Sequence, residues 1–223
     1  MKMLDKRISL FCGHYGSGKT EISINAALNL KEKNDKVAIV DLDIVNPYFR
    51  TAEHHELFKK SGIRLLSPTF AMTTVDIPGL PAQIQSVFDN PVEKVVFDVG
   101  GDDTGAVALG RYKHYLEKDS YAMYFVINVL RPFSSNVDDI EDLYRRICYR
   151  ARIEAAGIIN NTNYGAQTSA EDVIKGHEII LQASKRLDIP VSAVCAREDI
   201  AKELPDLGAP VFPIKTRMLP EWM

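Results

Sequence analysis

Residues 8–30 read ISLFC GHYGSGKT EISINAALNL, and this stretch decides the fold. The first five residues form a brief apolar run, as in a strand that is buried on both faces. The next eight are rich in glycine, and the apolar residues that follow recur at helical spacing. The sequence therefore predicts a strand, a glycine-rich loop and a helix, in that order.

The loop matches the pattern G-x-x-x-x-G-K-[ST] in the strand–loop–helix context that the pattern needs. Glycines let the backbone curl so that successive N–H groups face an anion, and the helix adds the positive end of its dipole. Lys19 is expected to reach the β- and γ-phosphates of a nucleotide, and the Thr20 hydroxyl to bind Mg²⁺. The alternative without a function is a glycine-rich turn that binds no ligand. The residues expected to contact the nucleotide here are Gly13, Tyr15, Gly16, Ser17, Gly18, Lys19, Thr20 and Glu21.

The rest of the chain alternates apolar strands with helices. Expected strands cover 36–41, 64–66, 94–98, 121–129, 156–159, 191–195 and 211–214, and expected helices cover 51–60, 78–89, 137–150 and 171–187. Because these strands are apolar throughout instead of alternating, they predict a parallel sheet covered on both faces. The expected fold class is α/β: a doubly wound, mostly parallel sheet flanked by helices in three Rossmann-like layers, in a single domain over residues 1–223.

Composition sets limits on the partners. The chain has 223 residues, 46% hydrophobic and 26% charged, with a net charge of −3, which gives no basic footprint for nucleic acid. No apolar stretch approaches the ~20 residues that span a bilayer, and no export signal is visible. We therefore expect a cytoplasmic protein without a nucleic-acid or membrane partner. Cys12, Cys148 and Cys195 lack C-x-x-C spacing and are expected to be reduced, mostly buried thiols.

Carboxylates close two of the expected strands. Asp41 and Asp43 close the second strand, and Asp98 closes the strand at 94–98. Ligands of open α/β sheets bind at the carboxyl ends of strands, and Mg²⁺ needs hard oxygen ligands. We assign Asp98 to the magnesium shell with Thr20, and Asp43 to the attacking water and the metal site. The alternative is that these carboxylates cap loops or helices.

Two glycines, Gly100 and Gly101, follow Asp98. Their backbone N–H groups could approach the γ-phosphate, with Gly101 as the expected contact. Such a loop would sense whether that phosphate is present.

Together, Gly13 to Thr20, Asp41-Leu42-Asp43 and Phe97-Asp98-Val99-Gly100-Gly101 resemble the MinD/ParA group of P-loop ATPases, in the SIMIBI class. That group includes nitrogenase iron protein, metal-insertion ATPases and the cobyrinate and dethiobiotin synthetases. The resemblance covers most of the chain, at the level of motif order and strand pattern. It implies ATP and Mg²⁺ as ligands, ATP hydrolysis, and either a homodimer in the ATP state or a protein partner.

The chain departs from the group at His14. Many members carry a lysine at this position, directly after the first glycine of the loop, and it reaches the partner's phosphate in an ATP-bound dimer. The change puts that trans mechanism in doubt and leaves cis nucleotide binding untouched. Arg50 or Arg131 could substitute for the lysine, although surface roles are favoured for both.

The family often reads the adenine edge with an asparagine after a late strand, and residues 157–161, GIINN, resemble that element. Asn161 is the preferred reader, with Asn160 second. Related GTPases select guanine with N-K-x-D, whereas residues 160–163 read NNTN, without the lysine or the acid. The sequence therefore favours ATP over GTP. A plain polar turn is the alternative.

Three functions stay open at this point. The first is an ATPase with Lys19 and Asp43 as catalytic residues, whose ATP-bound form dimerises or engages another protein. The second is an ATP-dependent synthetase that phosphorylates a carboxylate, with negligible turnover without its acceptor. The third is a nucleotide-binding regulatory module with little hydrolysis.

Overall fold

A computed structural model describes residues 2–43, 54–67, 82–101 and 103–218 of the chain. Its described strands form one sheet in the order β3-β2-β4-β1-β5-β6-β7-β8, and each of the seven pairings is parallel. The predicted α/β class is therefore confirmed. The strands are β1 (Ile8–Cys12), β2 (Val37–Leu42), β3 (Arg64–Leu66), β4 (Lys94–Val99), β5 (Tyr121–Ile127), β6 (Gly157–Asn160), β7 (Val191–Arg197) and β8 (Val211–Ile214).

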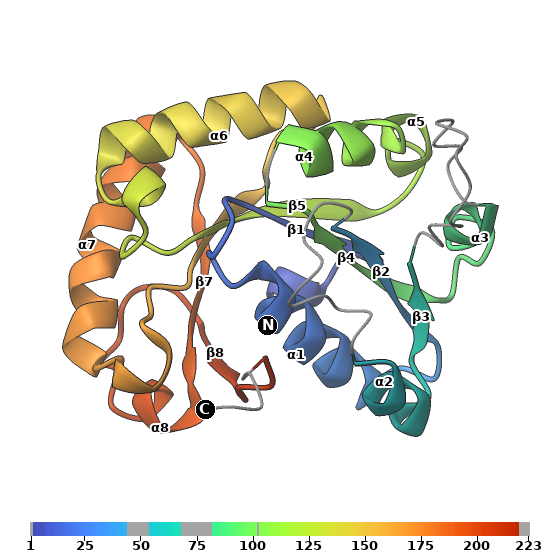
Figure 1. The fold of residues 1–223 in the computed structure, drawn as a ribbon, viewed down its shortest axis with the longest axis horizontal. Helices are drawn as coiled ribbons and strands as arrows, with labels where there is room; N and C mark the ends of the chain where they lie inside the picture. The colour runs from blue at the N-terminus through green and yellow to red at the C-terminus, as the bar shows by residue number, and fades with distance from the viewer. Residues whose placement is uncertain (1, 44–53, 68–81, 102, 219–223) are drawn as a thin grey trace, which may run out of the picture.

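Helices cover both faces of the sheet, with α4, α5 and α6 on one side and α1 and α2 on the other (Figure 1). The side chains of β1 alternate between the two cores: Leu10 and Cys12 face α4 and α6, whereas Phe11 faces α1. The helices are α1 (Lys19–Lys31), α2 (His55–Ser61), α3 (Ala82–Gln85), α4 (Asp103–Gly110), α5 (Lys113–Leu116), α6 (Val137–Ala151), α7 (Ala170–Leu187) and α8 (Glu198–Ala201). Short 3-10 turns occupy Lys2–Leu4, Pro132–Ser134 and Gly165–Gln167.

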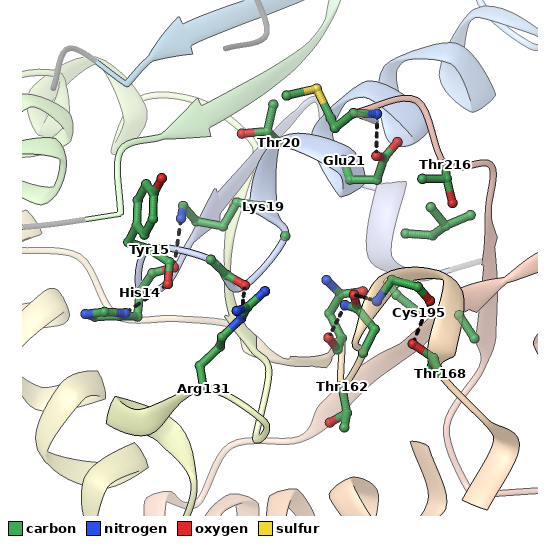
Figure 2. Close-up of a pocket in the computed structure, with 18 of the residues that line it drawn as sticks. His14, Tyr15, Lys19, Thr20, Glu21, Arg131, Thr162, Thr168, Cys195 and Thr216 are labelled. Carbon is green, nitrogen blue, oxygen red and sulfur yellow. Dashed lines mark hydrogen bonds between the residues drawn. The ribbon is translucent and has the colours of Figure 1, made fainter. Parts of the chain in front are cut away.

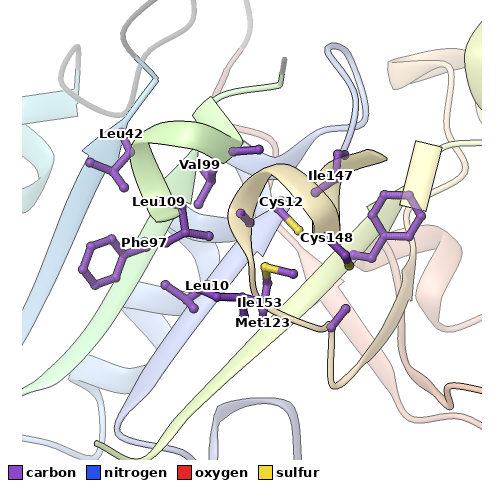
Figure 3. Close-up of a cluster of buried hydrophobic side chains, with 14 of the residues drawn as sticks. Leu10, Cys12, Leu42, Phe97, Val99, Leu109, Met123, Ile147, Cys148 and Ile153 are labelled. Atoms are coloured by element: carbon purple, nitrogen blue, oxygen red, sulfur yellow. The ribbon is translucent and has the colours of Figure 1, made fainter. Parts of the chain in front are cut away.

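The core under α4 and α6 is continuous across the central strands. Figure 3 shows Leu10, Phe97 and Met123 from three neighbouring strands, with Leu109 of α4 and Ile147 of α6 above them. Burying a side chain of this size stabilises a fold by about 1.5–3 kcal/mol. This packing fixes the carboxyl ends of β1 and β4, where the glycine loop and Asp98 lie.

Two of the predicted helices begin at polar caps. Asn136 accepts a hydrogen bond from the Asp139 backbone N–H at 3.0 Å and starts α6. Ser169 and Asp172 form a reciprocal capping box at the start of α7. These caps satisfy backbone donors that have no partner within the helix, which explains why both helices begin within a residue of their predicted starts.

Other helices differ from the expectation. The helix expected at 78–89 is confined to Ala82–Gln85 among the residues described there, and Ser86 to Ser120 contains α4 and α5, which the sequence did not predict. The α4 segment begins with Asp-Thr-Gly and ends in glycine, so propensity argues against a helix. Packing overrides it, because Ala106 and Leu109 are buried in the core.

Arg7 joins three segments at the amino end of the sheet. Its Nη1 donates to the carbonyl oxygens of Val87, Asn90 and Glu93 at 3.0–3.1 Å, and its Nε donates to Asp119 Oδ1 at 2.7 Å. The bond to Arg7 holds the pKa of Asp119 below its ordinary value of 3.8. The ion pair is therefore formed at neutral pH and lies mostly out of solvent.

We expect Asp119→Asn to lower the free energy of unfolding by about 1–3 kcal/mol at pH 7, because Arg7 loses a charged acceptor. Since the folded-state pKa of Asp119 is depressed, its contribution is present above the ordinary value and is lost as pH falls through the lower folded pKa. The difference between wild type and variant should therefore shrink below roughly pH 4. Urea unfolding at a series of pH values measures it. The exposed Asp35→Asn variant is the control, and an equal loss there at neutral pH would contradict the ion-pair argument.

The three cysteines are free and buried, as predicted. Burial raises the pKa of Cys12, of Cys148 to about 11, and of Cys195. All three are therefore thiols of low reactivity at neutral pH. Among the described helices, none is long and apolar enough to cross a membrane.

Candidate functional site

The site lies where successive strands change from one side of β1 to the other in the sheet. β1 is central, with β4 on one side and β5 on the other, so the loop after β1 opens at a topological switch point. That loop is the glycine-rich segment 13–18, and α1 begins immediately after it at Lys19. The predicted strand–loop–helix unit is confirmed.

The conformation of the loop backbone requires a glycine at position 18. This residue has φ 86°, in the left-handed region, and a β-carbon there would collide with the Asn161 amide nitrogen. The Asn161 Nδ2 donates to the carbonyl oxygen of Ser17 at 2.6 Å, so the loop after β6 supports the curled loop after β1. The sequence pattern predicted the loop, but it did not predict this brace.

Lys19 points back across the mouth of the loop. Its side chain is buried, and its Nζ donates to the carbonyl oxygen of His14 at 3.0 Å. A β-carbon built on Gly101 would lie 3.0 Å from the same Nζ. The ammonium group therefore lies between the glycine loop and the Gly101 segment after β4, where the sequence expected a γ-phosphate.

Gly101 is packed too closely for any side chain. Its β-carbon would lie 2.7 Å from the backbone nitrogen of Tyr15 and 2.8 Å from the Tyr15 Cα. We expect Gly101→Ala to push the two loops apart and to weaken nucleotide affinity about tenfold, the effect of a loss near 1.4 kcal/mol. Isothermal titration measures the affinity. Gly208→Ala, at a left-handed glycine with open space around it, is the control; equal losses in both variants would assign the effect to general instability.

The carboxylates of β2 and β4 lie side by side. Asp41 and Asp98 are register partners, and both are buried on the side of the sheet that α1 covers. Asp98 Oδ1 accepts a hydrogen bond from the Ser23 hydroxyl of α1 at 3.3 Å. Asp41 Oδ1 accepts from the backbone N–H of Asp43 at 2.9 Å, so Asp41 helps to orient the following loop.

Asp43 is half-buried and lines the cavity described below, whereas Asp98 is buried and is not part of that lining. The hydroxyl of Thr20 and these two carboxylates are hard oxygen donors of the kind that Mg²⁺ prefers. Among the described residues, no group of three His, Cys, Asp or Glu side chains could hold a metal by itself. The donor set therefore fits Mg²⁺ only if phosphate oxygens and waters complete the coordination.

A cavity of about 550 Å³ extends from the glycine loop to the loop after β6, the carboxyl end of β7 and the segment that ends and follows β8. Figure 2 places His14, Tyr15 and Lys19 at one end and Thr168, Cys195 and Thr216 at the other. Its wall includes most of the predicted nucleotide contacts, namely Tyr15, Gly16, Gly18, Lys19, Thr20, Glu21 and Asn161, together with the predicted water-orienting Asp43. Gly13, Ser17, Asp98 and Gly101 lie outside this lining.

The two candidate asparagines have different surroundings. Asn161 lines the cavity. Asn160 is fully buried, where its Oδ1 accepts from the backbone N–H and the hydroxyl of Thr162 at 3.0 and 2.7 Å, and its Nδ2 donates to Val173. Asn160 is therefore a structural residue, and only Asn161 stays a candidate for reading a base.

Arg131 and Phe133 lie beside the glycine loop. Arg131 Nε donates to the carbonyl oxygen of Gly16 at 3.1 Å, and the Phe133 ring packs at a tilt against that of His14, with the ring centroids 4.9 Å apart. Arg131 is exposed, as expected, but it also contacts the loop and lines the cavity. Nothing in the sequence singled out Phe133. Arg50 lies outside the described residues.

Glu21 has a contact that sequence reasoning missed. Its carboxylate accepts hydrogen bonds from the backbone N–H groups of Arg217 and Met218, each at 2.9 Å. Burial raises the pKa of Glu21, although these two bonds oppose the shift. A partner almost two hundred residues away cannot be read from local spacing.

No protein-family model matches the chain, and no curated protein matches it in sequence. Solved structures match it in fold. The cell division protein FtsY from Thermotoga maritima is 15% identical, with a TM-score of 0.58 over 86% of this chain and 62% of that chain. The Signal Recognition Particle 54 kDa protein from Aeropyrum pernix K1, in complex with GDP, is 18% identical, with a TM-score of 0.53 over 82% of this chain and 40% of that chain.

FlhF complexed with GTP and Mg²⁺ is also similar, at 16% identity and a TM-score of 0.52 over 86% of this chain and 66% of that chain. The chain thus spans less than two thirds of the length of FtsY and of the 54 kDa protein. At these identities the likeness shows the fold alone, and the narrower resemblance to the MinD/ParA group stays a prediction. The protein has the parallel α/β fold of these solved structures, which is the fold of P-loop NTPases.

Proposed function

We propose that this protein binds Mg-ATP in the 550 Å³ cavity and hydrolyses it as a nucleotide-dependent switch. The observation that carries the proposal is the position of Lys19. Its ammonium group is buried between the His14 carbonyl and Gly101, at the mouth of a glycine loop that opens a helix. A bound triphosphate would place its β- and γ-phosphate oxygens against this ammonium group, in a charge-assisted contact.

The proposal gives each site residue the following role. The backbone of 13–18 and the start of α1 bind the phosphates, and Lys19 neutralises the β- and γ-phosphate oxygens. Thr20 and Asp98 would hold the magnesium shell, and a bound Mg²⁺ would neutralise charge on the phosphates. Asp43 orients the attacking water. Catalysis then consists of positioning and electrostatic stabilisation.

The loop after β6, at the end of the cavity where we place the base, supports adenine over guanine. A guanine clamp needs a carboxylate that accepts from the base, and Asn163 stands at that place in the loop. The Asn163 Nδ2 donates to the Asn161 carbonyl at 2.8 Å, and its Oδ1 accepts from the Gly165 N–H at 3.2 Å. The amide is thus occupied within its own loop, whereas the Asn161 oxygen can accept from the amino group of adenine.

The phosphate end supports an encounter with a second protein surface. Tyr15, in the loop, and Phe133, which packs against His14 of the loop, are 56% and 61% exposed, although both are large aromatic residues. Aromatic residues are enriched in protein interfaces. We therefore propose that the ATP-bound form associates into a homodimer or engages a protein partner through this rim.

The test is a titration of the purified protein with ATP or GTP and Mg²⁺, following bound nucleotide, phosphate release and molecular mass together. The proposal expects preferential ATP binding, slow phosphate release and an ATP-dependent increase in mass or capture of one partner. Nucleotide binding without phosphate release would favour the regulatory module, and release only with an added carboxylate acceptor would favour the synthetase. No binding of either nucleotide would overturn the proposal.

A further inference from the structure

The chain returns to the glycine-loop helix near its carboxyl end. After β8, which pairs only with β7 in the described sheet, residues 215–218 cross over α1, and we name them the C-terminal strap. Because this segment belongs to no helix or strand, its backbone groups need other partners.

Two side chains of α1 supply those partners. The Asn25 Nδ2 donates to the Lys215 carbonyl oxygen at 3.0 Å, and its Oδ1 accepts from the Lys215 N–H at 3.0 Å. One turn earlier, the two oxygens of Glu21 each accept from a backbone N–H, of Arg217 and of Met218. The Asn25 Nδ2 also lies 3.2 Å from Glu21 Oε1, so the two side chains act together.

The strap forms part of the cavity wall. Thr216 and Met218 line the cavity, as does Ile214 at the end of β8. Figure 2 shows Thr216 on the same side of the cavity as Cys195 and Thr168, away from His14 and Tyr15, with Glu21 next to it. The glycine loop and Lys19 fix the place of the phosphates, so this far end is left for the nucleoside.

We propose that the C-terminal strap is a nucleoside-binding wall and that Glu21 and Asn25 are its positioning residues. The inference rests on the proposed function, because it assigns the far end of the same cavity. Glu21 follows Thr20 directly, so one turn of α1 serves both ends: Lys19 and Thr20 face the phosphates, whereas Glu21 holds the wall against the base and ribose. Loss of Glu21 therefore weakens recognition of the nucleoside and leaves recognition of the phosphates intact.

The test separates the two ends of the ligand. Binding of ATP and of inorganic tripolyphosphate, each with Mg²⁺, is compared for wild type, Glu21→Ala and Asn25→Ala. Because each variant removes two backbone partners of the strap, ATP affinity should fall about tenfold in each. Affinity for tripolyphosphate should stay at the wild-type value. The double variant should lose little more than either single one, because both substitutions release the same segment.

Glu32→Ala, an exposed position just after the same helix, is the matched control. Amide hydrogen exchange at residues 217 and 218 should accelerate in Glu21→Ala, with the wild-type thermal unfolding profile otherwise kept. Equal losses for ATP and tripolyphosphate would overturn the inference and place Glu21 with the phosphate site. ATP affinity unchanged in both variants would also overturn it. A wild-type protein that binds no ATP would instead refute the proposed function.

Discussion

Replacing Lys19 by methionine should weaken ATP binding about 100-fold and lower phosphate release about 1,000-fold, because the substitution removes the charge that faces the phosphates. Methionine keeps the aliphatic stem, so the buried volume is nearly preserved. The ammonium group has a fixed place beside the His14 carbonyl and Gly101, so its contribution needs little rearrangement when the ligand binds. Titration calorimetry and a phosphate-release assay measure the two effects.

A comparison of ATP with AMP sharpens this prediction. Lys19 is assigned to the β- and γ-phosphates, so the affinity for AMP should be the same in wild type and in Lys19→Met. Lys33→Ala removes an exposed lysine just beyond the same helix and serves as the control. A parallel loss of AMP binding would show that the variant damages the cavity as a whole, and an unchanged ATP affinity would refute the role of Lys19.

Much of the fold could be predicted because its signals are local. Apolar strands such as β2 and β5, and the spacing of buried residues along α6 from Ile140 to Ala151, are visible in the sequence. The helices α4 and α5 were missed because tertiary packing stabilises them, as the burial of Leu109 and Leu116 shows. Packing partners from other strands cannot be read from a short window.

The candidate site likewise has features with a local sequence signal and contacts that no local signal reveals. The glycine loop and Asp98 were predicted because a local pattern or a strand end carries them. The brace from Asn161 to Ser17 and the contact of Arg131 with Gly16 join loops that are far apart in the chain. Only the order of the strands brings these loops together, so the sequence named Asn161 and Arg131 without showing what they contact.

Asp43→Asn should lower phosphate release about 100- to 1,000-fold, within the range for losing a positioned proton acceptor, and leave ATP affinity unchanged. Asparagine keeps the shape of the side chain and the backbone N–H that bonds to Asp41, so the loop should hold its place. The exposed Asp142→Asn variant on α6 is the control.

Titration with Mg²⁺ then separates the role of Asp43 from that of Asp98. Asp98→Asn should raise the Mg²⁺ concentration needed for half-maximal rate, whereas Asp43→Asn should lower the rate at saturating Mg²⁺. If added Mg²⁺ restored the rate of Asp43→Asn, Asp43 would belong to the metal shell and another group would have to orient the water.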